Sequence, residues 1–185
     1  MIATHKISGT RMRHIAERAG MSQGNLHYYF STKEDLFRAL LLRMLKGFLE
    51  GRRSDLEDPV RHPAETLAVF FRQEKEILEQ RRETMYAFFD FWVQGTRDPD
   101  IREQIKGMYA AWRADIQKVV DRGVQQGAFS AAHASLVPWL MVALMDGAAL
   151  QYLIDDGKMN LEAYLASGLG MVLRLLEPMS QQGSG

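Results

Sequence analysis

The chain has 185 residues, of which 46% are hydrophobic and 25% are charged, the balance of a soluble globular protein. It contains no cysteine, which excludes disulfides and thiolate metal sites and, together with the lack of an apolar leader, favours a cytoplasmic protein. The net charge of zero is unevenly spread, because residues 1–53 hold ten Lys and Arg against four acids. This basic segment favours a polyanionic partner, although an ordinary solvated surface explains it equally well.

The first predicted elements are two short helices joined by a tight turn. Thr10 can cap a helix over residues 11–19, Gly20 can end it, and Ser22 can cap a second helix that runs to about Tyr29. This pattern is typical of a helix-turn-helix, in which the second helix enters the major groove of DNA. Short amphipathic helix pairs are nevertheless common in all-α proteins, so the spacing alone is a weak signal.

The outer face of the second helix carries groups that suit base recognition. Gln23, Asn25 and His27 fall on this face, and Gln and Asn can make paired hydrogen bonds to adenine. Gly24 would let the backbone approach DNA closely. We therefore expect this helix to be the recognition element.

A capping box precedes a longer helix. Ser31 or Thr32 can act as the cap, with Glu34 or Asp35 three residues further on. The apolar stripe that follows predicts a partly buried long helix; its members are Leu36, Phe37, Leu40, Leu41, Met44, Leu45 and Phe48. Residues 51–63, with two prolines, read as a linker. We expect a head of residues 1–50 and a body of residues 51–185.

The body is predicted to be all-α. Helices are expected from about Ala64, from about Glu83 to Gly95, from an Asp98 cap to Gly127, from Ser130 or Ser135 to Ile154, and from an Asn160 cap to Pro178. Residues 180–185 are expected to be a disordered tail. The apolar run 136–154 could mimic a membrane span, but Pro138 and Asp146 favour a buried helix of a soluble protein, and we expect no membrane partner.

The literal sequence of residues 10–37 is much more specific. The run Gly24-Asn-Leu-His-Tyr-Tyr-Phe30, followed by Lys33-Glu34, closely resembles the DNA-binding head of the TetR family of repressors. The body loosely resembles the choline-responsive, BetI-like branch of that family, through residues 91–93, 98–102 and 145–147. The resemblance implies a repressor that a small-molecule effector releases from double-stranded DNA.

The resemblance also implies which residues contact DNA. They are Thr10, Arg13, Gln23, Gly24, Asn25, His27, Tyr28, Tyr29 and Lys33. Base contacts would come from the recognition helix, and backbone contacts from the tyrosines, Lys33, Thr10 and Arg13. Family members usually have Tyr where this chain has His27, so base preference there is open. They also carry a full helix before this motif, where this chain has only Met1–His5. We expect that the natural start lies upstream and that this form is shortened.

An effector pocket among the middle helices is likewise implied by the resemblance. The candidate lining residues are Phe70, Glu74, Phe88, Phe89, Trp92, Met108, Trp112, Met145 and Asp146. Each apolar member is also compatible with plain core. Glu74 and Asp146 fall on apolar faces, where a carboxylate must be paired or protonated. They could meet a cationic effector, pair with an arginine or cap a helix.

The last two helices suit dimerisation. Small residues at 147–149 and at Gly168 and Gly170 permit close helix approach, and the resemblance implies a four-helix bundle with a second copy. No catalytic or phosphate-loop motif is visible, and no i, i+4 histidine pair suggests a metal site. We therefore expect neither an enzyme nor a cofactor. The alternative to a regulator is a dimeric helical sensor that has lost DNA binding.

Overall fold

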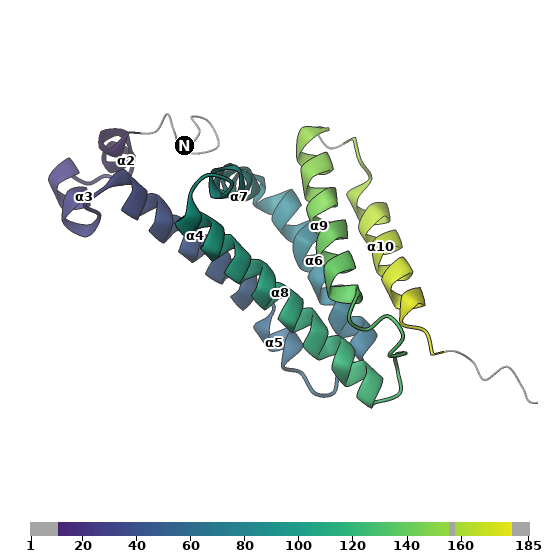
Figure 1. Ribbon diagram of the computed structural model, residues 1–185. Coiled ribbons are helices and arrows are strands. Elements are labelled where there is room, and N and C mark those ends of the chain that lie inside the picture. The colour runs from purple at the N-terminus through teal and green to yellow at the C-terminus, as the bar shows by residue number, and fades with distance from the viewer. Residues whose placement is uncertain (1–10, 156–157, 179–185) are drawn as a thin grey trace, which may run out of the picture. The chain divides into compact units, whose positions relative to one another are not determined.

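A computed structural model describes residues 11–155 and 158–178 of the chain. Every regular element within these ranges is a helix, which confirms the predicted all-α class. The helices are α2 Met12–Arg18, α3 Gln23–Tyr29, α4 Lys33–Glu50, α5 Arg53–Leu56, α6 Pro63–Gln80, α7 Arg82–Gly95, α8 Pro99–Gln125, α9 Val137–Ile154 and α10 Leu161–Leu175 (Figure 1). They fall into two compact units.

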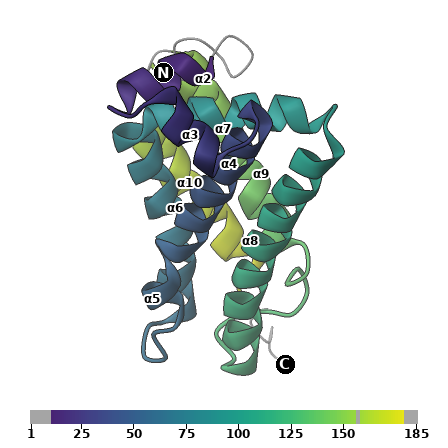
Figure 2. The ribbon, with the colours of Figure 1, turned by 90° about the vertical axis from the view of Figure 1, so that its left-hand side faces the viewer.

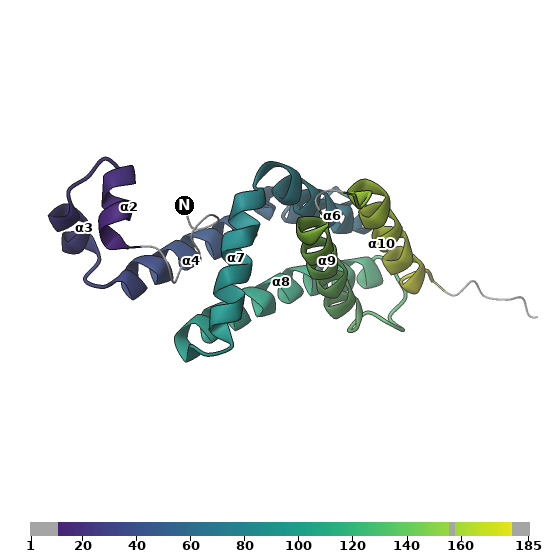
Figure 3. The ribbon, with the colours of Figure 1, turned by 90° about the horizontal axis from the view of Figure 1, so that it is seen from above.

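The first unit contains residues 11–48 and 82–108. Helices α2 and α3 lie side by side (Figures 1 and 3) and pack through Ala16 and Leu26, which are 1% and 3% exposed. Helix α4 buries Phe37, whose ring meets that of Phe91 on α7 edge to face at 6.2 Å. Arg38 of α4 forms a 3.0 Å ion pair with Asp100 at the start of α8.

The second unit contains residues 49–81, 109–155 and 158–178. From α5 the chain passes through a loop into α6 (Figure 2), and the antiparallel helices α9 and α10 pack against each other and against α6. The core of this unit is apolar and nearly solvent-free; its largest fully buried side chains are Phe70, Leu67, Leu78, Ile116, Met141, Met145 and Leu176.

Small residues bring these helices close together. Ala148 and Ala149 are fully buried within the unit, and a Cβ at Gly168 would lie 3.3 Å from the ring of Phe71. Close approach at these three positions thus serves packing inside one chain.

Several caps follow the sequence prediction. The Asp98 carboxylate accepts from the backbone N–H groups of Asp100 and Ile101 at 2.9 and 3.2 Å, and Asn160 accepts from Ala163 at 3.0 Å. Gly20 and Gly127 follow α2 and α8 with φ of +67° and +70°, the left-handed conformation that glycine adopts without strain.

Other expectations were wrong. The α9 cap position is Leu136, with no side-chain cap, rather than Ser130 or Ser135, because residues 131–136 form turns before the helix. The expected linker 51–63 contains the short helix α5. Trp92, one of the candidate lining residues, is 46% exposed, whereas its neighbour Phe91 is buried on α7. Position 11 caps α2 without a side-chain hydrogen bond, and the expected cap Thr10, residues 1–5 and the tail 180–185 lie outside the described residues.

One described helix, Val137–Ile154, is long and apolar enough to pass a length-and-composition test for a membrane span. The interior of the second unit covers one face of this helix, including Met141 and Met145. The helix also carries the polar Asp146 near its middle. These features are those of a core helix.

Candidate nucleic-acid interface and candidate effector site

The recognition helix α3 is held by local hydrogen bonds and one buried contact. The Ser22 hydroxyl accepts from the backbone N–H of Asn25 at 3.1 Å, which caps the helix as the sequence predicts. Leu26 is the buried residue of α3, and it anchors the helix against α2. The opposite face of α3 is therefore left to the solvent.

That outer face presents the predicted base-reading residues together. Gln23, Gly24, Asn25 and His27 are all exposed. Tyr28 and Tyr29 follow them with exposed fractions of 83% and 65%, and their rings meet edge to face at 5.2 Å. Large aromatic side chains are seldom so exposed without a partner surface.

The start of α4 lies next in the chain. The capping box is formed by Thr32 and Asp35, whose side chains accept from each other's backbone N–H groups at 3.0 and 3.1 Å. Lys33 opens the helix with its ammonium 5.6 Å from the centre of the Phe37 ring. Arg13 on α2 is exposed and lies 3.4 Å from Glu17. Lys33 and Arg13 thus offer cationic groups beside α3, whereas Thr10 lies outside the described residues.

The second unit buries an unusual group of charged side chains around Arg52. This residue, 2% exposed, follows α4; it pairs with Asp115 at 3.6 Å and donates to the Gln73 side chain at 3.0 Å. Its guanidinium lies 4.9 Å from the ring centre of Phe70 and 5.6 Å from that of Trp112. Burial lowers the pKa of Arg52 to about 10, against the raising effect of Asp115. Arg52 therefore stays charged at neutral pH.

Glu74 and Asp146, the two carboxylates singled out in the sequence, belong to the same group. Burial, reinforced by Asp146, raises the pKa of Glu74 to about 8, while Arg52 acts in the opposite direction. Burial also raises the pKa of Asp146 to about 6, although the Tyr109 hydroxyl, which donates to it at 2.8 Å, lowers it. Glu74 is accordingly mostly protonated near neutral pH. Glu74 thus interacts electrostatically with Arg52, and Asp146 accepts a hydrogen bond from Tyr109.

The predicted effector residues divide between the units. Phe70, Glu74, Trp112 and Asp146 gather around Arg52 and Tyr109, and Met145 is fully buried one position before Asp146. Phe88 and Phe89 lie in the first unit with ring centres 5.6 Å apart. Met108 is buried there and Trp92 is exposed. The sequence thus identified part of one polar cluster, but not its central residue, Arg52.

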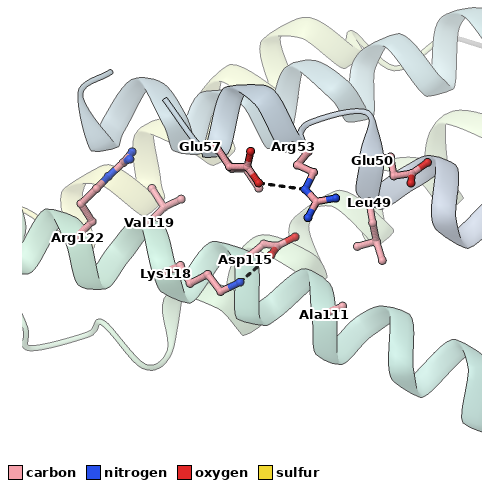
Figure 4. Close-up of a pocket in the computed structure, with 10 residues that line it drawn as sticks. Leu49, Glu50, Arg53, Glu57, Ala111, Asp115, Lys118, Val119 and Arg122 are labelled. Carbon is pink, nitrogen blue, oxygen red and sulfur yellow. Dashed lines mark hydrogen bonds and ion pairs between the residues drawn. The ribbon is translucent and has the colours of Figure 1, made fainter. Parts of the chain in front are cut away.

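A cavity of about 470 Å³ between α5 and α8 was also missed (Figure 4). It was hidden because residues 51–63 were interpreted as a linker. The i, i+4 pair Arg53 and Glu57, which form a 3.0 Å ion pair, is a helical signal that could have revealed α5. Among the described residues, no group of three His, Cys, Asp or Glu side chains could hold a metal ion.

The capped, exposed helix-turn-helix and the helical remainder place the chain in the helix-turn-helix class of all-α proteins. Residues 1–40 match the family described as bacterial regulatory proteins, tetR family, and residues 63–177 match the C-terminal domain of BetI-type transcriptional repressors. The chain therefore belongs to the TetR family of bacterial regulators. The resemblance predicted from residues 10–37 is confirmed.

Individual relatives agree with this assignment. The repressor KstR2 of Mycobacterium tuberculosis is 27% identical over 135 residues, which cover 70% of this chain and 64% of KstR2. The match thus spans less than two thirds of that relative's length. The regulator RutR of Escherichia coli K12 is 46% identical over 50 residues, which cover 27% of this chain and 24% of RutR.

Solved structures share the fold. A TetR transcription regulator from Haloarcula marismortui superposes with a TM-score of 0.86 at 20% identity, over 95% of this chain and 92% of that one. FadR from Bacillus subtilis, solved in complex with stearoyl-CoA, superposes with a TM-score of 0.79 at 19% identity, over 95% of this chain and 94% of that one.

Proposed function

We propose that the protein is a cytoplasmic, DNA-binding transcriptional repressor that acts as a homodimer and is released from a palindromic operator by a small-molecule effector. The observation that carries the proposal is the outer face of α3. There Gln23, Asn25 and His27 are exposed beside two exposed tyrosines, in a segment that is net basic and belongs to a family of regulators. No catalytic role is proposed.

Dimerisation through α9 and α10 is part of this proposal. Large apolar side chains remain exposed on these helices; they are Trp139, Leu150, Ile154 and Met171. Exposed apolar groups on neighbouring antiparallel helices suit a four-helix interface with a second copy. Two-fold symmetry would then place two recognition helices about one DNA turn, ~34 Å, apart or somewhat more. Sedimentation velocity tests the expected dimer.

The effector residues also remain a proposal. The group around Arg52 supports a ligand-responsive centre in the second unit, because charged side chains are rarely buried without a specific role or partner. FadR, which shares the fold, was solved with a bound acyl-CoA. We keep Phe70, Glu74, Trp112, Met145 and Asp146 as candidates there, and Phe88, Phe89, Trp92 and Met108 as candidates in the first unit.

Fluorescence anisotropy with labelled duplexes from the region upstream of the gene tests DNA binding. We expect one site, bound with a steep salt dependence. Gln23→Ala should relax the preference at one base pair, by about 1–3 kcal/mol. Lys33→Ala should weaken binding to all sequences alike and reduce the salt slope by about 1.

Lys106→Ala, which removes an exposed charge from α8, is the matched control and should leave DNA affinity unchanged. Failure of the unmutated chain to bind any duplex at low salt would contradict the proposal and favour a helical sensor without DNA binding.

A further inference from the structure

The cavity between α5 and α8 is lined entirely by residues of the second unit. The end of α4 and helix α5 form one wall, and the middle of α8 forms the other (Figure 4). Its volume of about 470 Å³ lies within the range of small-molecule sites. It is distinct from the cluster around Arg52, and shares with it only Asp115, the partner of Arg52.

The lining offers an apolar strip. Leu49 and Leu56 face the cavity from the first wall, and Ala111 and Val119 from the second. Ala111 and Val119 are eight residues apart on α8, about 12 Å along a helix axis. An aliphatic chain of several methylene groups can therefore lie along this strip and remove its own surface from water.

The charged lining is almost balanced, with one exception. Arg53 pairs with Glu57 at 3.0 Å, and Asp115 has two cations, Lys118 and Arg52, each at 3.6 Å. These groups neutralise one another within the protein. A ligand that engaged them would have to displace existing ion pairs.

Arg122 is the exception. Its guanidinium donates to the Asp58 backbone carbonyl at 3.1 Å and to the Thr66 hydroxyl at 2.8 Å, both neutral acceptors. Within the described part of the chain no carboxylate pairs with Arg122, and its Nε is buried without a hydrogen-bond partner. A half-buried cation that meets only neutral oxygens attracts an anion, since a carboxylate adds a charge–charge attraction that neutral oxygens do not supply.

We propose that this cavity binds a single-chain aliphatic carboxylate, with its anionic head on Arg122 and its chain along Leu49, Leu56 and Val119. Glu50 lies at the opposite end from Arg122 (Figure 4), so in this orientation the anionic head is kept away from an acidic residue. Because the cavity wall includes Asp115, a bound ligand also acts on Arg52 and the cluster around it. That regulatory consequence rests on the proposed function, whereas the binding itself does not.

Isothermal titration calorimetry of the full chain with octanoate, octylammonium and octanol tests the head-group preference. The three probes share one chain and differ in charge. We expect octanoate to bind at least tenfold more tightly than octylammonium, with octanol between them. Equal or tighter binding of octylammonium, or no octanoate binding up to its solubility, would overturn the proposal.

Two variants locate the site. Arg122→Gln keeps a polar side chain but removes the charge, and should weaken octanoate binding about tenfold while leaving octanol unchanged. Ala111→Trp should fill the cavity and abolish binding of all three probes. Lys106→Gln, the same loss of charge at a residue that does not line the cavity, is the control and should change nothing. If Arg122→Gln does not fold, unchanged octanoate binding by Ala111→Trp still overturns the assignment.

DNA binding measured with and without octanoate tests the effector role separately from ligand binding. Reduced affinity for the operator in octanoate, lost in Ala111→Trp, supports an effector role. Calorimetric binding without any change in DNA affinity overturns the effector role but leaves the ligand site standing. Absence of DNA binding under all conditions overturns the proposed function alone, because the calorimetric result is independent of DNA.

Discussion

Polar side chains are exposed on the outer face of α3 but buried in the cluster around Arg52. On α3, Gln23, Asn25 and His27 are exposed, and the helix is held by a cap and one buried leucine. Around Arg52, the charges are withdrawn from water and depend on each other. Polar groups kept for an outside partner can thus be replaced at little cost to the fold, whereas polar groups buried together cannot be removed one at a time.

Removal of the central charge of the buried cluster should have the largest effect on stability. Arg52→Ala leaves Asp115 without its buried partner and opens space against Phe70 and Trp112, so we expect the free energy of unfolding to fall by about 3–5 kcal/mol. Urea unfolding followed by circular dichroism measures the change. Arg53→Ala, at the next position but exposed, should stay within about 0.5 kcal/mol. Similar losses for the two variants would show that Arg52 is not a central contact.

The pH dependence of stability should reveal that the Glu74 carboxyl is protonated in the folded protein. The pKa of Glu74 is raised from its ordinary value of 4.5 to about 8 in the folded state. Between these two pH values the folded protein therefore keeps a proton that the unfolded chain has released. This stabilisation is complete below the unfolded pKa and is lost as the pH rises towards 8, with a slope of at most about 1.4 kcal/mol per pH unit. Asp146 adds a contribution of the same sign, lost as the pH rises through about 6.

Glu74→Gln should flatten this profile, because the amide is neutral at every pH. The measurement is the urea midpoint between pH 5 and pH 9 for both proteins. Glu76→Gln, an exposed change on the same helix, is the control and should retain the wild-type slope. A Glu74→Gln profile as steep as that of the unmutated chain would rule out the buried proton.

The smallest loss of stability is expected for a change in the helix-turn-helix. Ser22→Ala removes the hydroxyl that caps α3 and should cost about 1 kcal/mol, with a matching loss of DNA affinity as the recognition helix frays. Thermal unfolding and anisotropy report the two effects together. Ser31→Ala, an exposed serine outside the Thr32–Asp35 capping box, should be neutral. An unchanged melting temperature in Ser22→Ala would mean that Leu26 alone holds the helix.

Local chemistry made much of the fold predictable. The caps at Ser22, Asp98 and Asn160 and the left-handed glycines at 20 and 127 each depend on a few neighbouring residues, and all are present. Predictions failed where longer-range packing decides. Phe91 and Trp92 are neighbouring aromatic residues of α7, yet Phe91 is buried against the ring of Phe37 and Trp92 is 46% exposed.

In the candidate sites, too, the sequence predicted the residues that depend on local pattern and missed those that depend on distant partners. Exposure of the α3 face follows from helical periodicity, so the sequence predicted the exposed residues correctly. Glu74 and Asp146 were recognisable because carboxylates fell on apolar faces. Arg52 and the cavity beside α5 were not recognisable, since a basic residue in an apparent linker gives no sign that Asp115, some sixty positions later, will bury it.

The location of Arg52 also determines where hybrid regulators can be assembled. Gly51 is exposed, lies directly after α4 and precedes the residue that holds Asp115 and Gln73. A chimaera joined at Gly51 would carry Arg52 with its own partners, but the foreign segment would also have to supply the α4 side chains that pack on Phe91 and pair with Asp100. A junction a few positions later would put a foreign residue in the buried position of Arg52. Exchange of the segment before Gly51 thus depends both on the junction beside Arg52 and on the contacts of α4 with residues 82–108.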